Sequence, residues 1–186
     1  MLTIVIPVKN PPNIDLFISE NKKLFAKYQI VVIDSGGGEK LKEYSNVFIQ
    51  KSMSLVEARK LGYSKAKTKY ILNLDVDVVI PKGYIEMALI MLGKGADAVS
   101  IFYEDVAHCQ GALEFGCSIW RTNVLRKLYD FSFEFVNDGK LYRVGPRTFA
   151  TLNNGWCECT YMWRKLKEND YTLTTCAYRA KHLRVI

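Results

Sequence analysis

The segment that decides the fold is YILNLDVDVVIP, residues 70–81, where two carboxylates interrupt a run of apolar and β-branched residues. The run predicts a buried strand over residues 70–75. Residues two apart in an extended chain share a face, so we expect Asp75 and Asp77 to direct their carboxylates to one point beyond the strand. Such a pair repels unless a cation lies beside it, and Mg²⁺ or Mn²⁺ takes oxygen ligands. A solvated turn before Pro81 is the alternative interpretation.

Working outward, strand-like and helix-like segments alternate through the first half of the chain. The expected strands are residues 2–8, 29–34, 46–50, 70–75 and 96–105. Amphipathic helices are expected after Pro12, after a capping box at Ser54–Glu57, and after Pro81. This alternation predicts a single α/β domain with a mostly parallel sheet and helices on both faces. Ligands bind such sheets at the carboxyl ends of the strands, where Asp34 and Asp75 are expected.

The second half of the chain is less regular. Residues 111–120 predict a strand and residues 121–129 a short helix, followed by a loop-rich stretch over residues 130–155. Another helix is expected with Cys159, Met162, Trp163 and Leu166 on one face, and closing strands over residues 171–177 and 178–186.

The charge balance is basic, with 26 Lys and Arg residues against 19 Asp and Glu residues and a formal net charge of +7. A basic surface favours nucleic acid, an anionic membrane or a phosphorylated substrate. The sequence shows no signal peptide and no apolar stretch long enough to span a membrane. We therefore expect a cytoplasmic protein, with peripheral contact to an anionic membrane as a further hypothesis.

Five cysteines are present, an odd number that favours reduced, buried thiols. A zinc site formed by Cys157, Cys159, Cys176 and His182 is the weaker alternative, because C-x-C is an unusual spacing for structural zinc.

Three segments occur in an order that resembles the GT-A fold glycosyltransferases of the family 2 type. They are TIVIPVKN, then VVIDSGGGE, then EARKLGYSKAKTKYILNLDVDVVIP, the last ending in a D-x-D motif. The resemblance is good over residues 1–130 and looser beyond, and the short chain is similar to compact archaeal or archaeal-virus members. It implies a GT-A, Rossmann-like domain with a nucleotide-binding half (1–105) and an acceptor-binding half (106–186).

The resemblance implies a role for several individual residues. Pro7, Lys9, Asp34, Arg59 and Asp75 would bind the sugar nucleotide. Asp75, Asp77 and His182 would hold Mn²⁺ or Mg²⁺ against the diphosphate. Gly116 would leave room in the floor of the acceptor site.

Glu158 aligns with the glutamate of the family's acidic helix, so the resemblance makes it the general base. Its expected place in the first helical turn suits an ionised carboxylate. Capping of the helix is the alternative role for Glu158, and Trp156 is either an acceptor-stacking residue or core. The chain departs from the family pattern at Cys159, where an aspartate is usual, and at Lys60, where an asparagine is usual.

The leading hypothesis is a metal-dependent glycosyltransferase that moves a sugar from a UDP- or GDP-linked donor to a glycan, lipid-linked or protein acceptor, with inversion. One alternative is a non-catalytic basic binding module, either a degenerate transferase or a nucleic-acid binder. The basic residues look dispersed rather than interleaved with aromatic residues, which disfavours nucleic acid. A sugar nucleotidyltransferase is the other alternative, disfavoured because no glycine-rich phosphate loop follows the first strand.

Overall fold

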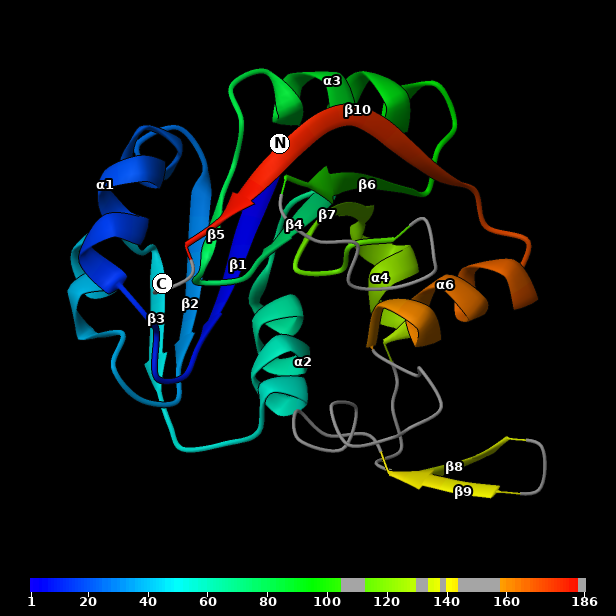
Figure 1. Cartoon of the computed structure of the whole chain (residues 1–186), viewed down its shortest axis with the longest axis horizontal. Coiled ribbons are helices and arrows are strands. Elements are labelled where there is room, and N and C mark those ends of the chain that lie inside the picture. The colour runs from blue at the N-terminus through cyan, green and yellow to red at the C-terminus, as the bar shows by residue number, and fades with distance from the viewer. Residues whose placement is uncertain (105–112, 130–133, 138–139, 144–157, 184–186) are drawn as a thin grey trace.

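A computed structural model describes residues 1–104, 113–129, 134–137, 140–143 and 158–183 (Figure 1). Its strands are β1 (Leu2–Val8), β2 (Gln29–Asp34), β3 (Val47–Gln50), β4 (Tyr70–Leu74), β5 (Val78–Val79), β6 (Ala98–Tyr103), β7 (Cys117–Arg121), β8 (Glu134–Asn137), β9 (Lys140–Arg143) and β10 (Leu173–His182). Its helices are α1 (Ile14–Phe25), α2 (Leu55–Lys65), α3 (Tyr84–Gly93), α4 (Thr122–Leu128), α6 (Glu158–Glu168) and the 3₁₀ helix η1 (Glu39–Tyr44).

The main sheet has the strand order β3-β2-β1-β4-β7-β6-β10-β5. The pairs β3–β2, β2–β1, β1–β4 and β6–β10 are parallel, whereas β7 is antiparallel to both neighbours and β5 is antiparallel to β10. The expected mostly parallel α/β sheet is therefore confirmed. Because β2 and β4 are both parallel to β1, Asp34 at the end of β2 and Asp75 directly after β4 lie at the same edge of the sheet.

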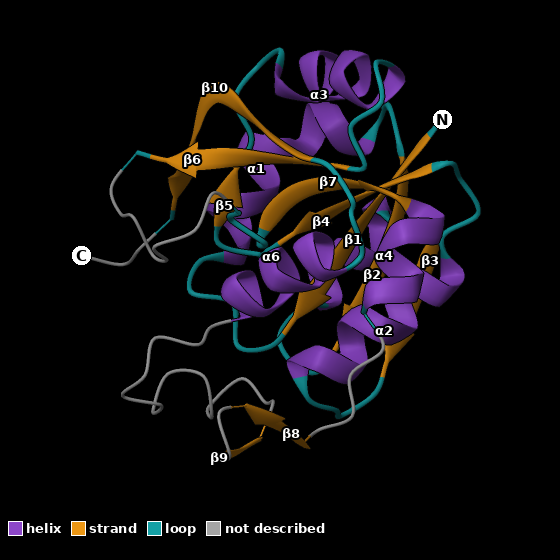
Figure 2. Ribbon diagram, turned by 90° about the vertical axis from the view of Figure 1, so that its right-hand side faces the viewer, coloured by secondary structure: helices purple, strands orange, loops and turns teal. Residues whose placement is uncertain are grey.

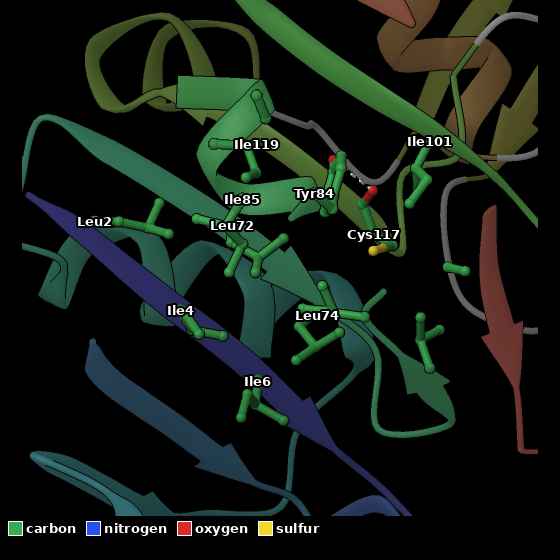
Figure 3. Packing of buried hydrophobic residues seen from close by; sticks show 14 of the residues in the cluster. Leu2, Ile4, Ile6, Leu72, Leu74, Tyr84, Ile85, Ile101, Cys117 and Ile119 are labelled. Carbon is green, nitrogen blue, oxygen red and sulfur yellow. Dashed lines mark hydrogen bonds between the residues drawn. The ribbon is translucent and has the colours of Figure 1, made fainter. Parts of the chain in front are cut away.

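Helices cover both faces of this sheet, as the sequence predicts (Figures 1 and 2). Along β1, Ile4 and Ile6 belong to a core with α1 and α3, while Val5 belongs to a second core with α2, α4 and α6. Figure 3 shows the first core, in which Ile4 and Ile6 of β1 lie beside Leu72 and Leu74 of β4. Both faces of β1 and β4 are buried, which explains why the two strands are almost entirely apolar, with Thr3 and Asn73 as their polar residues.

The capping box at the start of α2 is confirmed. The hydroxyl of Ser54 accepts from the backbone N–H of Glu57, and the Glu57 carboxylate accepts from the backbone N–H of Ser54. This reciprocal pair fixes where α2 begins and therefore which of its residues face the sheet.

The geometry expected for residues 70–81 is partly wrong. The strand ends at Leu74, and the chain then turns, with the backbone N–H of Val78 donating to the carbonyl of Asp75 over 3.1 Å. Asp75 and Asp77 are therefore in a turn and not in an extended strand, because β5 leaves β4 to pair with β10. The strand predicted over residues 70–75 is confirmed as β4, the turn that was the alternative interpretation is present, and the short strand β5 was not predicted.

Three other expectations about the second half need correction. The strand expected over residues 111–120 begins at Cys117. The two closing strands are a single strand, β10, whose register against β6 shifts between Thr175 and Arg179. The stretch expected to be loop contains the hairpin β8–β9, because its Phe, Val, Leu and Tyr residues favour strand despite the neighbouring turn signals.

A buried asparagine of α1 fixes the segment that follows the Asp75–Val78 turn. Asn21 is fully buried, and its side-chain amide donates to the carbonyl of Val78 (3.0 Å) and accepts from the backbone N–H of Ile80 (3.3 Å). The side chain thereby satisfies two backbone groups of the segment around β5. No helical or strand pattern in the sequence predicts these two hydrogen bonds.

We predict that Asn21→Leu lowers the free energy of unfolding by about 2 kcal/mol, because two buried backbone groups lose their partner. Urea denaturation of the variant and of a control, Glu20→Gln, measures this loss; Glu20 is exposed on the same helix. Equal stability of the two variants would contradict the role of Asn21.

Candidate active site

A cavity of about 410 Å³ opens at the carboxyl edge of the sheet. It is lined by Pro7, Lys9, Asn10, Pro12, Leu55, Asp75, Val76 and Asp77. The structure thus brings together four residues that the sequence predicted to share a site, namely Pro7, Lys9, Asp75 and Asp77. The turn after β4 directs both aspartates to one cavity even though it is not extended.

The loops after β1 and β2 are tied together beside this cavity. Asn10 donates its backbone N–H to the carbonyl of Gly36, and Ser35 donates to the carbonyl of Val8. A Cβ on Gly37 would lie 2.8 Å from a ring carbon of Pro11, and Gly37 also has a φ of +89°. A glycine is therefore needed where the SGGG segment packs against the Pro11–Pro12 loop.

Asp34 is placed differently from the other predicted donor-binding residues. Its carboxylate is fully buried and accepts from the backbone N–H groups of Gly36 (2.8 Å) and Gly38 (3.0 Å). It is not among the described residues that line the cavity, and in this structure it holds the glycine turn after β2. Its predicted contact with a sugar nucleotide stays a prediction.

Arg59 lies behind the cavity and joins two carboxylates from distant parts of the chain. Its side chain is 3% exposed; one terminal nitrogen donates to Asp75 over 2.5 Å and the other to Glu158. Burial by itself lowers the Arg59 pKa, but Asp75 and the surrounding groups outweigh burial and raise it, so the guanidinium stays charged. The buried Nε of Arg59 has no hydrogen-bond partner among the described residues.

Aromatic residues complete the surroundings of Glu158, which begins α6 as the sequence predicts. The hydroxyl of Tyr129 donates to the Glu158 carboxylate, and burial raises the pKa of Tyr129, which keeps this donor protonated. The ring of Phe115 stacks on Tyr129 at 5.6 Å and lies 5.3 Å from the Arg59 guanidinium. Sequence patterns gave Phe115 and Tyr129 no role, because their contact with Glu158 and Arg59 arises from residues far apart in the chain.

His182 lies on β10, opposite Val78 of β5, and its ring is 3.9 Å from that of Tyr103. The backbone N–H of Leu183 donates to the carbonyl of Asp77, so the end of β10 is held against the turn that carries both aspartates. Trp156 and Cys157, which the sequence singled out, lie outside the described residues.

The D-x-D motif implies a divalent metal, so the side chains of this site must offer the ligands that such an ion requires. Across the described ranges, no three His, Cys, Asp or Glu side chains lie close enough together to hold a metal by themselves. The predicted set of Asp75, Asp77 and His182 is therefore not a complete metal site. The same is true of Cys159, Cys176 and His182, the described members of the alternative zinc site. Two carboxylates at one cavity do suit Mg²⁺ or Mn²⁺, since these ions usually complete their coordination with water and substrate phosphates.

Comparison with known proteins identifies the family. The family model for glycosyl transferase family 2 matches residues 3–111, more than half of the chain. The chain belongs to glycosyl transferase family 2. No curated protein matches it significantly by sequence.

Solved structures of low sequence identity share the fold. A mannosyltransferase from Pyrobaculum calidifontis in complex with GDP-Man and Mn²⁺ matches with a TM-score of 0.68 and 14% identity, over 98% of this chain and 56% of that one. S. aureus TarS matches with a TM-score of 0.64 and 15% identity, over 98% of this chain and 36% of that one. Glucosyl-3-phosphoglycerate synthase from Mycobacterium tuberculosis, bound to Mn²⁺, UDP-Glc and phosphoglyceric acid, matches with a TM-score of 0.63 and 14% identity, over 100% of this chain and 72% of that one. The chain thus spans about a third of TarS and just over half of the mannosyltransferase.

Gly116 provides the first test of this site. A Cβ on Gly116 would lie 2.3 Å from a carboxylate oxygen of Asp75 and 3.0 Å from the hydroxyl of Tyr103. We predict that Gly116→Ala displaces the Asp75 side chain and lowers the free energy of unfolding by about 1–3 kcal/mol. Thermal unfolding measures the loss, and Gly93→Ala is the control because an added Cβ there meets nothing within 4 Å. A variant as stable as Gly93→Ala would contradict the close packing of Asp75 on Gly116.

The cysteines provide a pH-dependent test. Burial raises the pKa of Cys159 to about 11 from an ordinary value of 9.0, and it also raises the pKa of Cys117. A raised thiol pKa stabilises the fold fully below pH 9, and this contribution is lost as the pH rises from 9 toward 11. In a Cys109→Ser/Cys157→Ser background, we expect slow alkylation by iodoacetamide at pH 8 and a fall in thermal stability above pH 9. Rapid alkylation of Cys159 at pH 8 in the folded protein would contradict this prediction.

Proposed function

We propose that this chain transfers a glycosyl group from a nucleoside diphosphate-sugar to an acceptor hydroxyl. The observation that carries the proposal is the cavity at the carboxyl edge of the sheet, where Asp75 and Asp77 of a family 2 chain lie beside Lys9. The binding of GDP-Man by one structural relative and of UDP-Glc by another supports a donor of this class. The family match favours this reaction over a non-catalytic module or a nucleotidyltransferase.

In the proposed reaction the chain binds its donor in the nucleotide-binding half, residues 1–105. Pro7 and Lys9 line the cavity that would hold the nucleotide, and Lys9 supplies a positive charge for the diphosphate. Asp75 and Asp77 would hold Mn²⁺ or Mg²⁺, without His182, which forms no three-ligand group with them. A bound divalent ion supplies positive charge that stabilises the departing diphosphate.

Glu158 is the proposed base of the acceptor-binding half, residues 106–186. Its carboxylate lies at the N-terminus of α6 and contacts Arg59, and both are favourable surroundings for a negative charge. Glu158 would accept the proton of the acceptor hydroxyl as that oxygen attacks the anomeric carbon. Attack opposite the leaving group inverts that carbon.

The contacts of Arg59 support a proposed position for the reacting sugar. Arg59 contacts Asp75 at the donor cavity with one nitrogen and Glu158 with another. The reacting sugar would therefore lie between two carboxylates that a single guanidinium positions.

The described part of the chain contains no helix long and apolar enough to cross a bilayer. Peripheral attachment to an anionic membrane would place the basic protein next to lipid-linked acceptors.

The proposal is tested by thermal unfolding with UDP, GDP and their sugar conjugates, each with and without Mn²⁺. We predict that one nucleotide stabilises the protein only when metal is present, by about 2.7 kcal/mol at a concentration about 100 times its Kd. Asp77→Asn should abolish this stabilisation, whereas Asp15→Asn, an exposed acid paired with Lys40, should retain it.

Turnover supplies the second half of the test. Glu158→Gln should retain the nucleotide-dependent stabilisation but lose transfer by a factor of about 10² or more, the usual contribution of a general base. Absence of a metal-dependent shift with every nucleotide would overturn the proposed function.

A further inference from the structure

An exposed phenylalanine lies one residue before the end of strand β6. Phe102 is 44% exposed, whereas its neighbours Ile101 and Tyr103 are buried. Because β6 and β4 are both antiparallel to β7, they run in the same direction and end at the same edge of the sheet. The phenyl ring is therefore at the carboxyl edge, where Asp75 and the donor cavity also lie.

Phe102 is on the face of the sheet that packs against α6. Ala98 belongs to the core that contains residues of α6, whereas Val99 and Ile101 belong to the opposite core. Side chains alternate along a strand, so Ser100 and Phe102 are on the α6 side. This is the helix that begins with the proposed base.

Hydrogen bonds connect the same face of β6 with the start of α6. The hydroxyl of Ser100 accepts from the backbone N–H of Glu114 over 2.8 Å. The next residue, Phe115, donates its backbone N–H to the thiol of Cys159 over 3.4 Å. Cys159 directly follows the proposed base, so the end of β6 and the acceptor-binding half meet through this segment.

Tyr103 connects the end of β6 with the donor side of the site. Its hydroxyl is 3.0 Å from the position that a Cβ on Gly116 would take, and a carboxylate oxygen of Asp75 is 2.3 Å from the same position. Phe102 therefore precedes a residue that approaches Asp75, and its own side chain is on the face that carries the proposed base.

Arg179 of β10 is directly opposite Phe102 in the pairing of β10 with β6. Its guanidinium carbon is 5.8 Å from the centre of the Phe102 ring, and its Nη1 donates to the carbonyl of Tyr103 over 3.2 Å. Arg179 is exposed, and within the described residues it forms no ion pair, including with the exposed Glu104. The pair thus presents an apolar ring and a cation side by side to solvent.

We propose that Phe102 and Arg179 form a subsite for an acceptor sugar that carries a negatively charged group, either a carboxylate or a phosphate. The apolar, C–H-bearing face of the sugar packs on the phenyl ring, whose face is electron-rich. The guanidinium donates to the oxygens of the charged group. Naming the sugar as the acceptor rests on the proposed function, whereas the binding of an anionic sugar by this pair does not.

The subsite is tested by titrating the full chain in EDTA, at constant ionic strength, while recording ¹H–¹⁵N NMR spectra. The probes are glucose 6-phosphate, glucuronic acid, glucose and inorganic phosphate. We expect the amide signals of Phe102 and Arg179 to shift with an anionic sugar. Glucose alone and phosphate alone should bind about tenfold more weakly, because each makes only half of the contacts. The tighter of the two anionic sugars identifies the charged group as phosphate or carboxylate.

Two variants separate the two halves of the contact. Arg179→Gln should weaken the anionic sugars about tenfold, the loss expected for a charge-assisted hydrogen bond, and leave glucose unaffected. Phe102→Leu, which keeps an apolar side chain but removes the flat ring, should weaken both kinds of sugar about threefold. Lys181→Gln is the matched control for charge, because Lys181 is exposed on the same strand but lies opposite Val79. Ile90→Ala is the control for the loss of an exposed apolar side chain.

A cross-strand pair of this kind can also serve only to stabilise the sheet. Thermal unfolding of each variant measures that role separately. A loss of stability in the Phe102 and Arg179 variants with unchanged sugar binding would overturn the subsite. So would equal weakening by Lys181→Gln, equal affinity for phosphate and glucose 6-phosphate, or shifts confined to Leu55 of the donor cavity. The titration contains no donor, metal or turnover, so its failure leaves the proposed glycosyl transfer standing.

Discussion

The buried guanidinium of Arg59 is the interaction on which the site depends. A charge removed from water is stable only when it is paired, and Arg59 is paired with Asp75 after β4 and with Glu158 at the start of α6. Three elements from separate parts of the chain therefore meet at one side chain. Removing any one of the three charges would leave the remaining ones imperfectly compensated in a mostly buried site.

Several features of the local structure hold Arg59 and its partners in this position. The capping box at Ser54 and Glu57 fixes the start of α2, which places Arg59 on the helix face toward the sheet. Phe115 lies against the guanidinium, and Gly116 leaves the space that the Asp75 carboxylate occupies. The backbone of Asp75 is fixed as well, because its N–H donates to the carbonyl of Gly116. The position of the carboxylate pair is thus set by backbone as well as by side chains.

How much the sequence predicts depends on the distance between the interacting residues. Strands β1 to β4, strand β6 and the capping box follow from patterns a few residues long, and the structure agrees with them. The place of Glu158 in a first helical turn came from the family resemblance, and the structure agrees with it as well. The turn at Asp75 and Asp77 was only the alternative interpretation, because β5 pairs with β10, about a hundred residues later, and a local pattern carries no trace of that partner. The roles of Asn21 and Tyr129 could not be predicted either, because their partners, Val78 and Glu158, are also far away in the sequence. Family resemblance named Arg59 as a donor-binding residue, but it did not reveal that its two partners are carboxylates.

The contacts of Arg59 and Tyr129 also explain how the proposed reaction could keep its two carboxylates apart in role. In that reaction a divalent ion would accompany the nucleoside diphosphate beside Asp75 and Asp77, because its negative charge and theirs repel. Glu158 takes part in a different set of contacts, because Tyr129 donates to it and Arg59 donates to both Glu158 and Asp75. The proposed base would therefore be held from two sides, by a tyrosine hydroxyl and by the guanidinium that also holds Asp75.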